Sequence, residues 1–330
     1  MVEVLSDATT ETQDRDGRTP LHLAALHGNL DAFSVLTNEL GADVTATDNT
    51  NRSVLHLAAT GGNEKIITKL VADFDIDANC RDDENETLLH RAVKAGKVVA
   101  VETLAGHAAD LEARDRRWRT PLFVACMEGQ DEIVKTLLKL GADKGATDDF
   151  DSTPLNQAAW YGHEAVVRHL IDGRLDEEIK SDAGWGPLHG AAMHGYEGVV
   201  RALIEAGADT ETKDEDGMTP MHHAAEQGYE DIARLLAMHG ADVDSQDSKG
   251  MTPLHYAAEE TYTRVVRRTH GKGVRQRSMV DVANPGRETV VGILLAAGAN
   301  KEVRNSEGKT ALDLAVKAGK EMVVTMLGAM

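Results

Sequence analysis

Cysteine is scarce in this chain: its 330 residues include only two, Cys80 and Cys126. They lie in different parts of the sequence and provide no disulfide framework, which fits a reducing compartment. No apolar stretch approaches the ~20 residues that a membrane span needs. The N-terminal segment has neither a basic start nor a long apolar run, so no signal peptide is evident. These absences favour a soluble monomer of the cytoplasm or the nucleus.

Positive charge and catalytic motifs are also lacking. The chain has 35 Lys and Arg against 55 Asp and Glu, a formal net charge of −20. This balance argues against a nucleic-acid surface over most of the chain. No glycine-rich phosphate loop or nucleophile elbow is present, and no hydrolase or transferase nucleophile can be identified. The sequence therefore predicts a protein that is not an enzyme and that carries no cofactor.

What the chain has instead is one seven-residue phrase, which occurs nine times. It reads Thr-Pro-Leu-His-Leu-Ala-Ala where it first appears, at positions 19–25. Its later copies begin at Ser53, Thr87, Thr120, Thr153, Gly186, Thr219, Thr252 and Thr310. Successive copies begin 33 or 34 residues apart, and only the last step, from Thr252 to Thr310, is much longer. A nearly fixed period indicates a chain built from one repeated structural unit.

Each copy of the unit reads as two short helices followed by a turn. Thr19 suits an N-cap and Pro20 the first helical position, where no amide donor is needed. Gly28 ends the first helix, and a second helix then extends to a stop at Gly41. Residues 41–48 are polar and predict a hairpin-like loop, here called a finger, that reaches the next unit. One such pair cannot bury both helices alone, so neighbouring pairs must stack.

This period and this phrase are typical of ankyrin repeats, and the chain resembles that family over residues 14–330. The resemblance implies an all-α solenoid of about nine helix-turn-helix repeats, with finger hairpins that form little or no strand. Residues 1–13 lack the motif and predict a polar, partly disordered extension. The last repeat stops inside its second helix, as a terminal cap or a truncated chain would. The resemblance also implies binding of another protein or peptide on the concave face, which the fingers and first helices line.

Two sets of titratable side chains recur with the repeat and could be mistaken for catalytic or metal sites. Six histidines occupy the fourth place of the phrase: His22, His56, His90, His189, His222 and His255. In ankyrin repeats this histidine braces the finger through hydrogen bonds that involve the threonine of the phrase. Zinc needs about four ligands around one point, whereas these side chains are one repeat apart, so no metal site is expected. The recurrent finger acids predict turn-forming and capping groups: Asp48, Asp82, Asp115, Asp148, Asp214 and Asp247.

The repeats differ most in their aromatic residues. All three tryptophans, Trp118, Trp160 and Trp185, lie in the middle repeats, at places that vary from one repeat to the next. Trp118 replaces the finger-tip glycine seen at Gly17 or Gly217. The candidate binding set adds neighbouring residues at comparable places: Phe150, Tyr161, Arg117, Arg119, Gln157, Met127, Met193 and His194. Trp, Tyr and Arg are enriched in interface hot spots, so we expect a binding surface. The alternative is that the tryptophans fill gaps between fingers.

The second difference is an insertion in the eighth repeat, which alignment places at 261–285. This insertion is basic in an acidic chain, and its possible contact residues are Arg264, Arg267, Arg268, Lys272, Arg275 and Arg277. Such a run is usually a solvated loop. It could also fold back on the acidic repeats or meet an acidic partner.

The prediction for function is therefore a non-enzymatic scaffold whose groove binds a protein or peptide of basic or mixed charge, with an aromatic centre in repeats 4–6. The alternative is a small-molecule or catalytic pocket in the same patch, with His189, His194 or His223 as the proton carrier. A regulatory segment of a larger chain is a third class.

Overall fold

The computed structural model describes residues 10–172, 183–259 and 285–328. These residues form 18 helices and no strand, apart from the isolated bridges Thr47–Ser53 and Arg81–Thr87. The helices make nine consecutive pairs, so the predicted all-α repeat architecture is confirmed. No helix among the described residues is long and apolar enough to cross a membrane. The basic residues of the insertion, from Arg264 to Arg277, lie outside the described residues, as do residues 1–9.

The chain divides into two compact units, residues 1–172 and 173–330. The first unit contains five helix pairs. Their bounds are α1 Pro20–His27, α2 Leu30–Asn38, α3 Val54–Gly61, α4 Glu64–Ala72, α5 Leu88–Lys94, α6 Val98–Gly106, α7 Pro121–Met127, α8 Asp131–Lys139, α9 Pro154–Trp160 and α10 Glu164–Ile171.

The second unit contains four pairs, and the insertion falls between the two helices of the third. The bounds are α11 Pro187–His194, α12 Glu197–Glu205, α13 Pro220–Gln227, α14 Glu230–Met238, α15 Pro253–Ala258, α16 Pro285–Ala296, α17 Ala311–Lys317 and α18 Glu321–Gly328. α16 packs on both α15 and α14, so the repeat resumes after the insertion.

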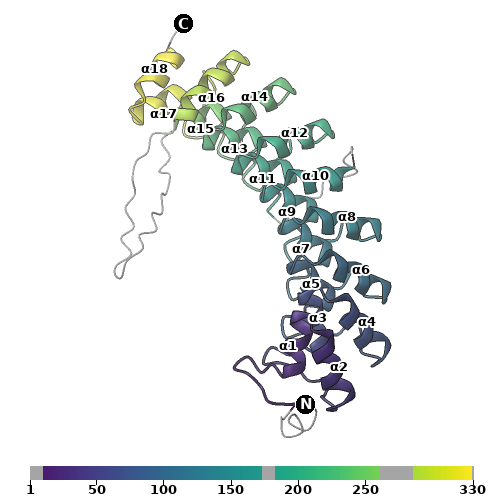
Figure 1. Ribbon diagram of the computed structural model, residues 1–330. Helices are drawn as coiled ribbons and strands as arrows, with labels where there is room; N and C mark the ends of the chain where they lie inside the picture. The colour runs from purple at the N-terminus through teal and green to yellow at the C-terminus, as the bar shows by residue number, and fades with distance from the viewer. Residues whose placement is uncertain (1–9, 173–182, 260–284, 329–330) are drawn as a thin grey trace, which may run out of the picture. The chain divides into compact units, whose positions relative to one another are not determined.

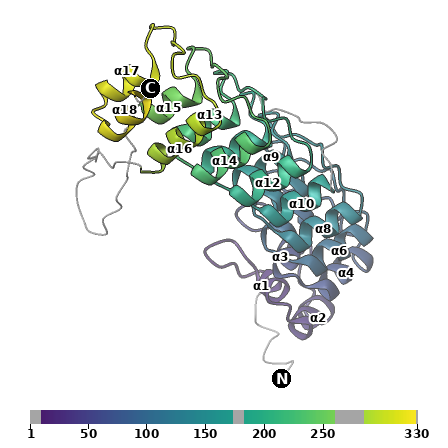
Figure 2. The ribbon, with the colours of Figure 1, turned by 90° about the horizontal axis from the view of Figure 1, so that it is seen from above.

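Within each unit the helices form two layers. In the first unit α1, α3, α5, α7 and α9 stack in one row, and the even-numbered helices stack beside them in a second row (Figure 1). The same arrangement holds in the second unit, from α11 to α18. The finger loops project to one side of the helices, as the turned view shows (Figure 2). Within each unit, the first helices therefore form one row of the stack and the second helices the other.

Local sequence explains where the first helices begin. Every phrase starts with an extended N-cap residue, and six of the nine helices have proline in their first turn. The third residue of the phrase lies on the apolar stripe of its first helix, and this pattern predicts a buried side chain in every repeat. Seven of the nine side chains are: Leu21, Leu55, Leu89, Leu122, Leu188, Met221 and Leu254. The expectation is wrong for Leu155 and Leu312, which are only half-buried. For Leu312 the cause is that α17 packs against one first helix, α15, and not between two.

The bracing role of the phrase histidine is confirmed. In α13 the amide of Thr219 donates to Nδ1 of His222 at 3.0 Å, so Nδ1 carries no proton. Nε2 therefore carries the proton and donates to the carbonyl oxygen of Met251, in the next finger, at 3.1 Å. His22, His90, His189 and His255 repeat this pattern. Each of these histidines ties one repeat to the next, and it does so only as a neutral ring.

Candidate finger-tip surface

Trp118 forms the tip of the finger that precedes α7, in a backbone conformation that large side chains rarely adopt. Its φ is +60°, and its side chain is 62 % exposed. Positive φ recurs at this place in the other described fingers, where the residues are Gly17, Asn51, Asn85, Asp151, Gly184, Gly217, Gly250 and Gly308. All of these are residues that tolerate left-handed backbone, whereas tryptophan incurs a cost of about 1–2 kcal/mol there. An exposed aromatic held at such a cost motivates a functional hypothesis.

The next finger tip carries a second exposed aromatic, Phe150, which is 61 % exposed. The two fingers are joined by a backbone bond from the amide of Asp149 to the carbonyl oxygen of Arg117, at 3.2 Å. Arg114 joins them again, because its Nη1 donates to the carbonyl oxygens of Trp118, at 2.7 Å, and of Thr147. The guanidinium carbon of Arg114 lies 5.7 Å from the Trp118 ring centroid, a cation–π contact. The structure thus places Trp118 and Phe150 on adjacent, mutually fastened loops.

Three further predicted residues lie behind these tips. Arg119 binds Oδ2 of Asp115 through Nε, at 2.8 Å, and Nη2, at 2.6 Å, and its Nη1 reaches Sδ of Met127 at 3.8 Å. Gln157, on α9, donates to Oγ of Ser152 at 3.0 Å. These side chains are half-buried and bond to other residues of the chain, so their role is to hold the finger loops in place and not to offer exposed area to a partner. Arg117, by contrast, is exposed.

The end of α9 supplies the other two aromatic members of the candidate binding set in this unit. Trp160 is the last residue of the helix and is half-buried. Tyr161 follows it, is 47 % exposed, and stacks on the His163 ring with 6.2 Å between centroids. Nε2 of His163 in turn bonds to the carbonyl oxygen of Met127, at 3.1 Å, at the end of α7. Tyr161 is therefore held against a histidine that ties this repeat to the previous one.

The remaining predicted residues belong to the second unit. Trp185 is half-buried, with its ring centroid 4.7 Å from that of His223 and 6.0 Å from that of His189. Trp185 packs against two histidines, as expected for a side chain that fills a gap between fingers, whereas Trp118 is mostly exposed. Met193 and His194, near the end of α11, are half-buried, and burial lowers the pKa of His194.

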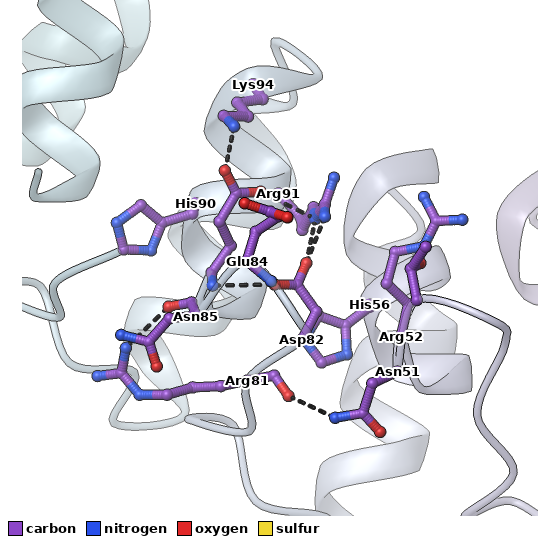
Figure 3. A network of polar contacts seen from close by, with 12 residues as sticks. Asn51, Arg52, His56, Arg81, Asp82, Glu84, Asn85, His90, Arg91 and Lys94 are labelled. Carbon is purple, nitrogen blue, oxygen red and sulfur yellow. Dashed lines mark hydrogen bonds and ion pairs between the residues drawn. The ribbon is translucent and has the colours of Figure 1, made fainter. Parts of the chain in front are cut away.

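The finger aspartates make specific bonds that inspection of the sequence did not anticipate. Figure 3 shows the arrangement at Asp82, whose Oδ2 receives Nε of Arg91 at 2.8 Å. Arg91 also lies 3.1 Å from Glu86, which Lys94 contacts in turn. Asp82 and Glu86 are both buried, so their charges are compensated inside the protein.

In most other fingers, too, Oδ2 of the aspartate accepts a hydrogen bond from a side chain. Oδ2 of Asp48 receives Nε of Arg52 at 2.8 Å, and that of Asp115 receives Arg119. In the second unit, Asp214 receives Nε2 of His223 at 2.9 Å, and Asp247 receives the Tyr256 hydroxyl at 2.6 Å. The donors come either four or nine positions after the aspartate, a spacing visible in the sequence. Asp148 differs, because Ser152 and Gln157 stand at those two places and bind each other.

These bonds change the acidity of the carboxyl groups. Burial raises the pKa of Asp48, but the bonds from Arg52 and Thr50 outweigh it and hold the pKa at about 2. Burial likewise opposes the bonds from Arg119 at Asp115, whose pKa is lowered overall. At Asp148 burial prevails over the two backbone bonds, and the pKa is raised. Asp148 is thus a carboxylate whose charge is incompletely compensated by its surroundings.

Comparison with known proteins identifies the repeat. A family model described as ankyrin repeats, in three copies, matches residues 1–82, 55–148, 122–214 and 188–268. The chain belongs to the ankyrin-repeat family. Ankyrin repeats are generally protein-interaction scaffolds and are typically not enzymes. The curated proteins include no match to this chain. Among the described residues, no group of three or more His, Cys, Asp or Glu side chains could hold a metal ion.

Proposed function

We propose that this ankyrin array binds a protein or peptide segment at the finger tips and first helices of its middle repeats. In the first unit the proposed contact surface centres on Trp118 and Phe150, with Arg117 and Tyr161 beside them. Each of these four side chains is exposed, and three of them, Arg117, Trp118 and Phe150, lie on two adjacent fingers joined by a backbone hydrogen bond. In the second unit, Trp185, Met193 and His194 are proposed as contact residues in their own right, and Trp185 is tested by its own variant.

The observation that carries the proposal is the conformation of Trp118. Folding alone favours glycine, asparagine or aspartate at this tip, as the other fingers show. The indole is mostly exposed, so packing within the protein returns little of the backbone cost. A large aromatic side chain that is rigid and accessible is well suited to insert into a pocket on a partner.

Charge indicates the chemistry of the partner. The whole chain carries −20, and Asp151, next to Phe150, is an exposed acid. Complementary potentials accelerate encounter and disfavour like-charged competitors. We therefore propose a partner segment of basic or mixed charge.

The catalytic alternative receives no comparable support. His223, the most distinctive of its candidate proton carriers, is 3 % exposed and bonds to the buried Asp214. It stands where Arg91 and Tyr256 stand in their repeats and makes the same kind of bond to the preceding finger. Its environment is that of a structural tie between finger and helix.

The test uses a peptide selected from a random display library on the whole protein. Trp118→Asn is expected to weaken binding of that peptide by on the order of 2 kcal/mol, as hot-spot residues do. Because asparagine tolerates left-handed backbone, thermal stability should stay equal or rise. Phe150→Ala and Trp185→Ala are measured in parallel. Val99→Ala, a change at an exposed position of α6, is the matched control and should bind normally. Unchanged affinity in Trp118→Asn and Phe150→Ala together would contradict the proposed surface.

A further inference from the structure

Asp148 interrupts a pattern that the other finger aspartates of the first unit establish. Asp48, Asp82 and Asp115 each bind an arginine of this chain through Oδ2: Arg52, Arg91 and Arg119. Their carboxylates are covered as a result, with side-chain exposures of 0 %, 0 % and 2 %. The first finger is more exposed, and its arginine, Arg18, pairs with Asp16.

The backbone half of the pattern is fully present at Asp148. Its Oδ1 accepts the amides of Phe150, at 3.0 Å, and Ser152, at 2.9 Å. The corresponding oxygen of Asp48 accepts the amides of Thr50, at 2.9 Å, and Arg52, at 3.1 Å. The loop therefore orients the Asp148 carboxylate as the other loops orient theirs. Only the donor to Oδ2 is different.

No side chain among the described residues bonds to Asp148. Ser152 occupies the place of Arg52 and Arg119, and its hydroxyl is bound by Gln157. The nearby guanidinium of Arg119 is already bonded to Asp115 and Met127. Asp148 itself is half-buried, so its carboxylate remains accessible from solvent. Burial, with no cation bonded to Asp148 in the part of the chain that the structure describes, is consistent with the raised pKa of this group.

We propose that the binding partner supplies the missing arginine, whose guanidinium pairs with Oδ2 of Asp148 beside the exposed Phe150 ring. This inference rests on the proposed function and specifies one anchor of its partner. Arginine is the expected residue because three equivalent carboxylates of this unit receive a guanidinium, each of them through both Nε and Nη2. A planar guanidinium can also stack on an aromatic face, which a lysine ammonium does less well. A charged bond to a preorganised, partly desolvated carboxylate gives specificity as well as affinity.

The experiment is a selection from a random peptide display library on the whole protein, run in parallel on three variants. Asp148→Asn removes the charge at the anchor. Asp149→Asn removes the same charge from an exposed neighbour and is the matched control. Ser152→Arg places an arginine where Arg52 and Arg119 stand, so it supplies the missing group from within. Gln157→Arg, equivalent to Arg91, serves the same purpose if Ser152→Arg does not fold.

Wild type and Asp149→Asn are expected to enrich peptides with arginine at one position, and the two other variants to lose that enrichment. Replacing the selected arginine by lysine should weaken binding about tenfold or more. Ser152→Arg should also unfold at a higher temperature than wild type. Arginine enrichment that survives in Asp148→Asn, or in folded Ser152→Arg, would overturn the inference while leaving the proposed surface intact. Equal binding of the lysine peptide would also overturn it. Failure of wild type to select any peptide would remove both the inference and the proposed function.

Discussion

At the scale of single residues, the protonation state of the phrase histidines controls how well neighbouring repeats are joined. Nδ1 of each ring accepts an amide hydrogen, so a second ring proton would break that bond, and in five of the six rings, those other than His56, Nε2 donates to the next finger. Burial lowers the pKa of His56, His189 and His222 to about 4 from an ordinary value of 6.5. The unfolded chain therefore binds protons in a range where the folded chain does not.

This difference predicts a stability that depends on pH in a definite direction. Above pH 6.5 both states are neutral at these rings, and the stabilisation is fully present. As the pH falls from 6.5 to about 4 the unfolded state takes up protons first, so the free energy of unfolding decreases. Each ring contributes on the order of 3 kcal/mol across this window. Urea unfolding at a series of pH values measures the slope.

His222→Asn introduces the residue found at Asn156. It should lower the dependence of the free energy of unfolding on pH by the amount that corresponds to about one bound proton. His27→Asn changes an exposed histidine of α1 and is the control, with a slope like that of wild type. If His222→Asn and wild type lose stability in parallel as the medium becomes acidic, the neutral-ring account is wrong.

At the scale of helices and loops, the eighth repeat keeps its two helices packed together although a long insertion lies between them in the sequence. These helices are α15 and α16, and residues 259–284 lie between them. Arg287, in α16, is 4 % exposed and donates to the carbonyl oxygens of Glu259, at 2.9 Å, and Glu226. Arg287 therefore joins α16 to the residues that follow α15 and belongs to the packed repeats.

Deleting residues 261–285 should leave the solenoid folded, because it restores the regular repeat spacing between Thr252 and Thr310 and retains Arg287. Circular dichroism is expected to show unchanged helix content, and the midpoint of thermal unfolding should shift only modestly. Loss of the cooperative transition would show that the insertion is part of the scaffold. If Arg264, Arg267, Arg268, Lys272, Arg275 and Arg277 contact an acidic partner, an acidic peptide should associate more slowly with the shortened protein than with the whole protein.

The sequence predicted helix starts and histidine bonds because both depend on neighbours within one repeat or at a fixed distance of one repeat. Thr219 and His222 are close in sequence, and the carbonyl of Met251 follows in the next finger. Burial of Leu155 could not be predicted in this way, because it depends on which side chains pack over α9. The aspartate bonds were missed although Arg52 and Arg91 stand at regular offsets, since two different offsets serve one acceptor. The incomplete bonding of Asp148 was not predicted either, because it depends on Ser152 and Gln157 bonding to each other.

At the scale of the whole molecule, stability is distributed along the stack. In the first unit α7 packs on α5, α8 and α9, so its helices depend on immediate neighbours and on no common centre. Leu122, in α7, is fully buried. A cavity at this position should cost about 2–5 kcal/mol and weaken the first unit selectively.

Leu122→Ala is therefore expected to separate unfolding into two stages, with the first unit unfolding at lower denaturant concentration than the second. The tryptophans allow each unit to be followed: a variant that keeps only Trp160 reports the first unit, and one that keeps only Trp185 reports the second. Leu155→Ala removes the same atoms from a half-buried side chain and should shift the first transition less. Each unit has its own internal packing, so a defect deep in one should leave the midpoint of the other nearly unchanged. Identical midpoints from the two fluorescence probes in Leu122→Ala would instead show that the array unfolds as one cooperative body.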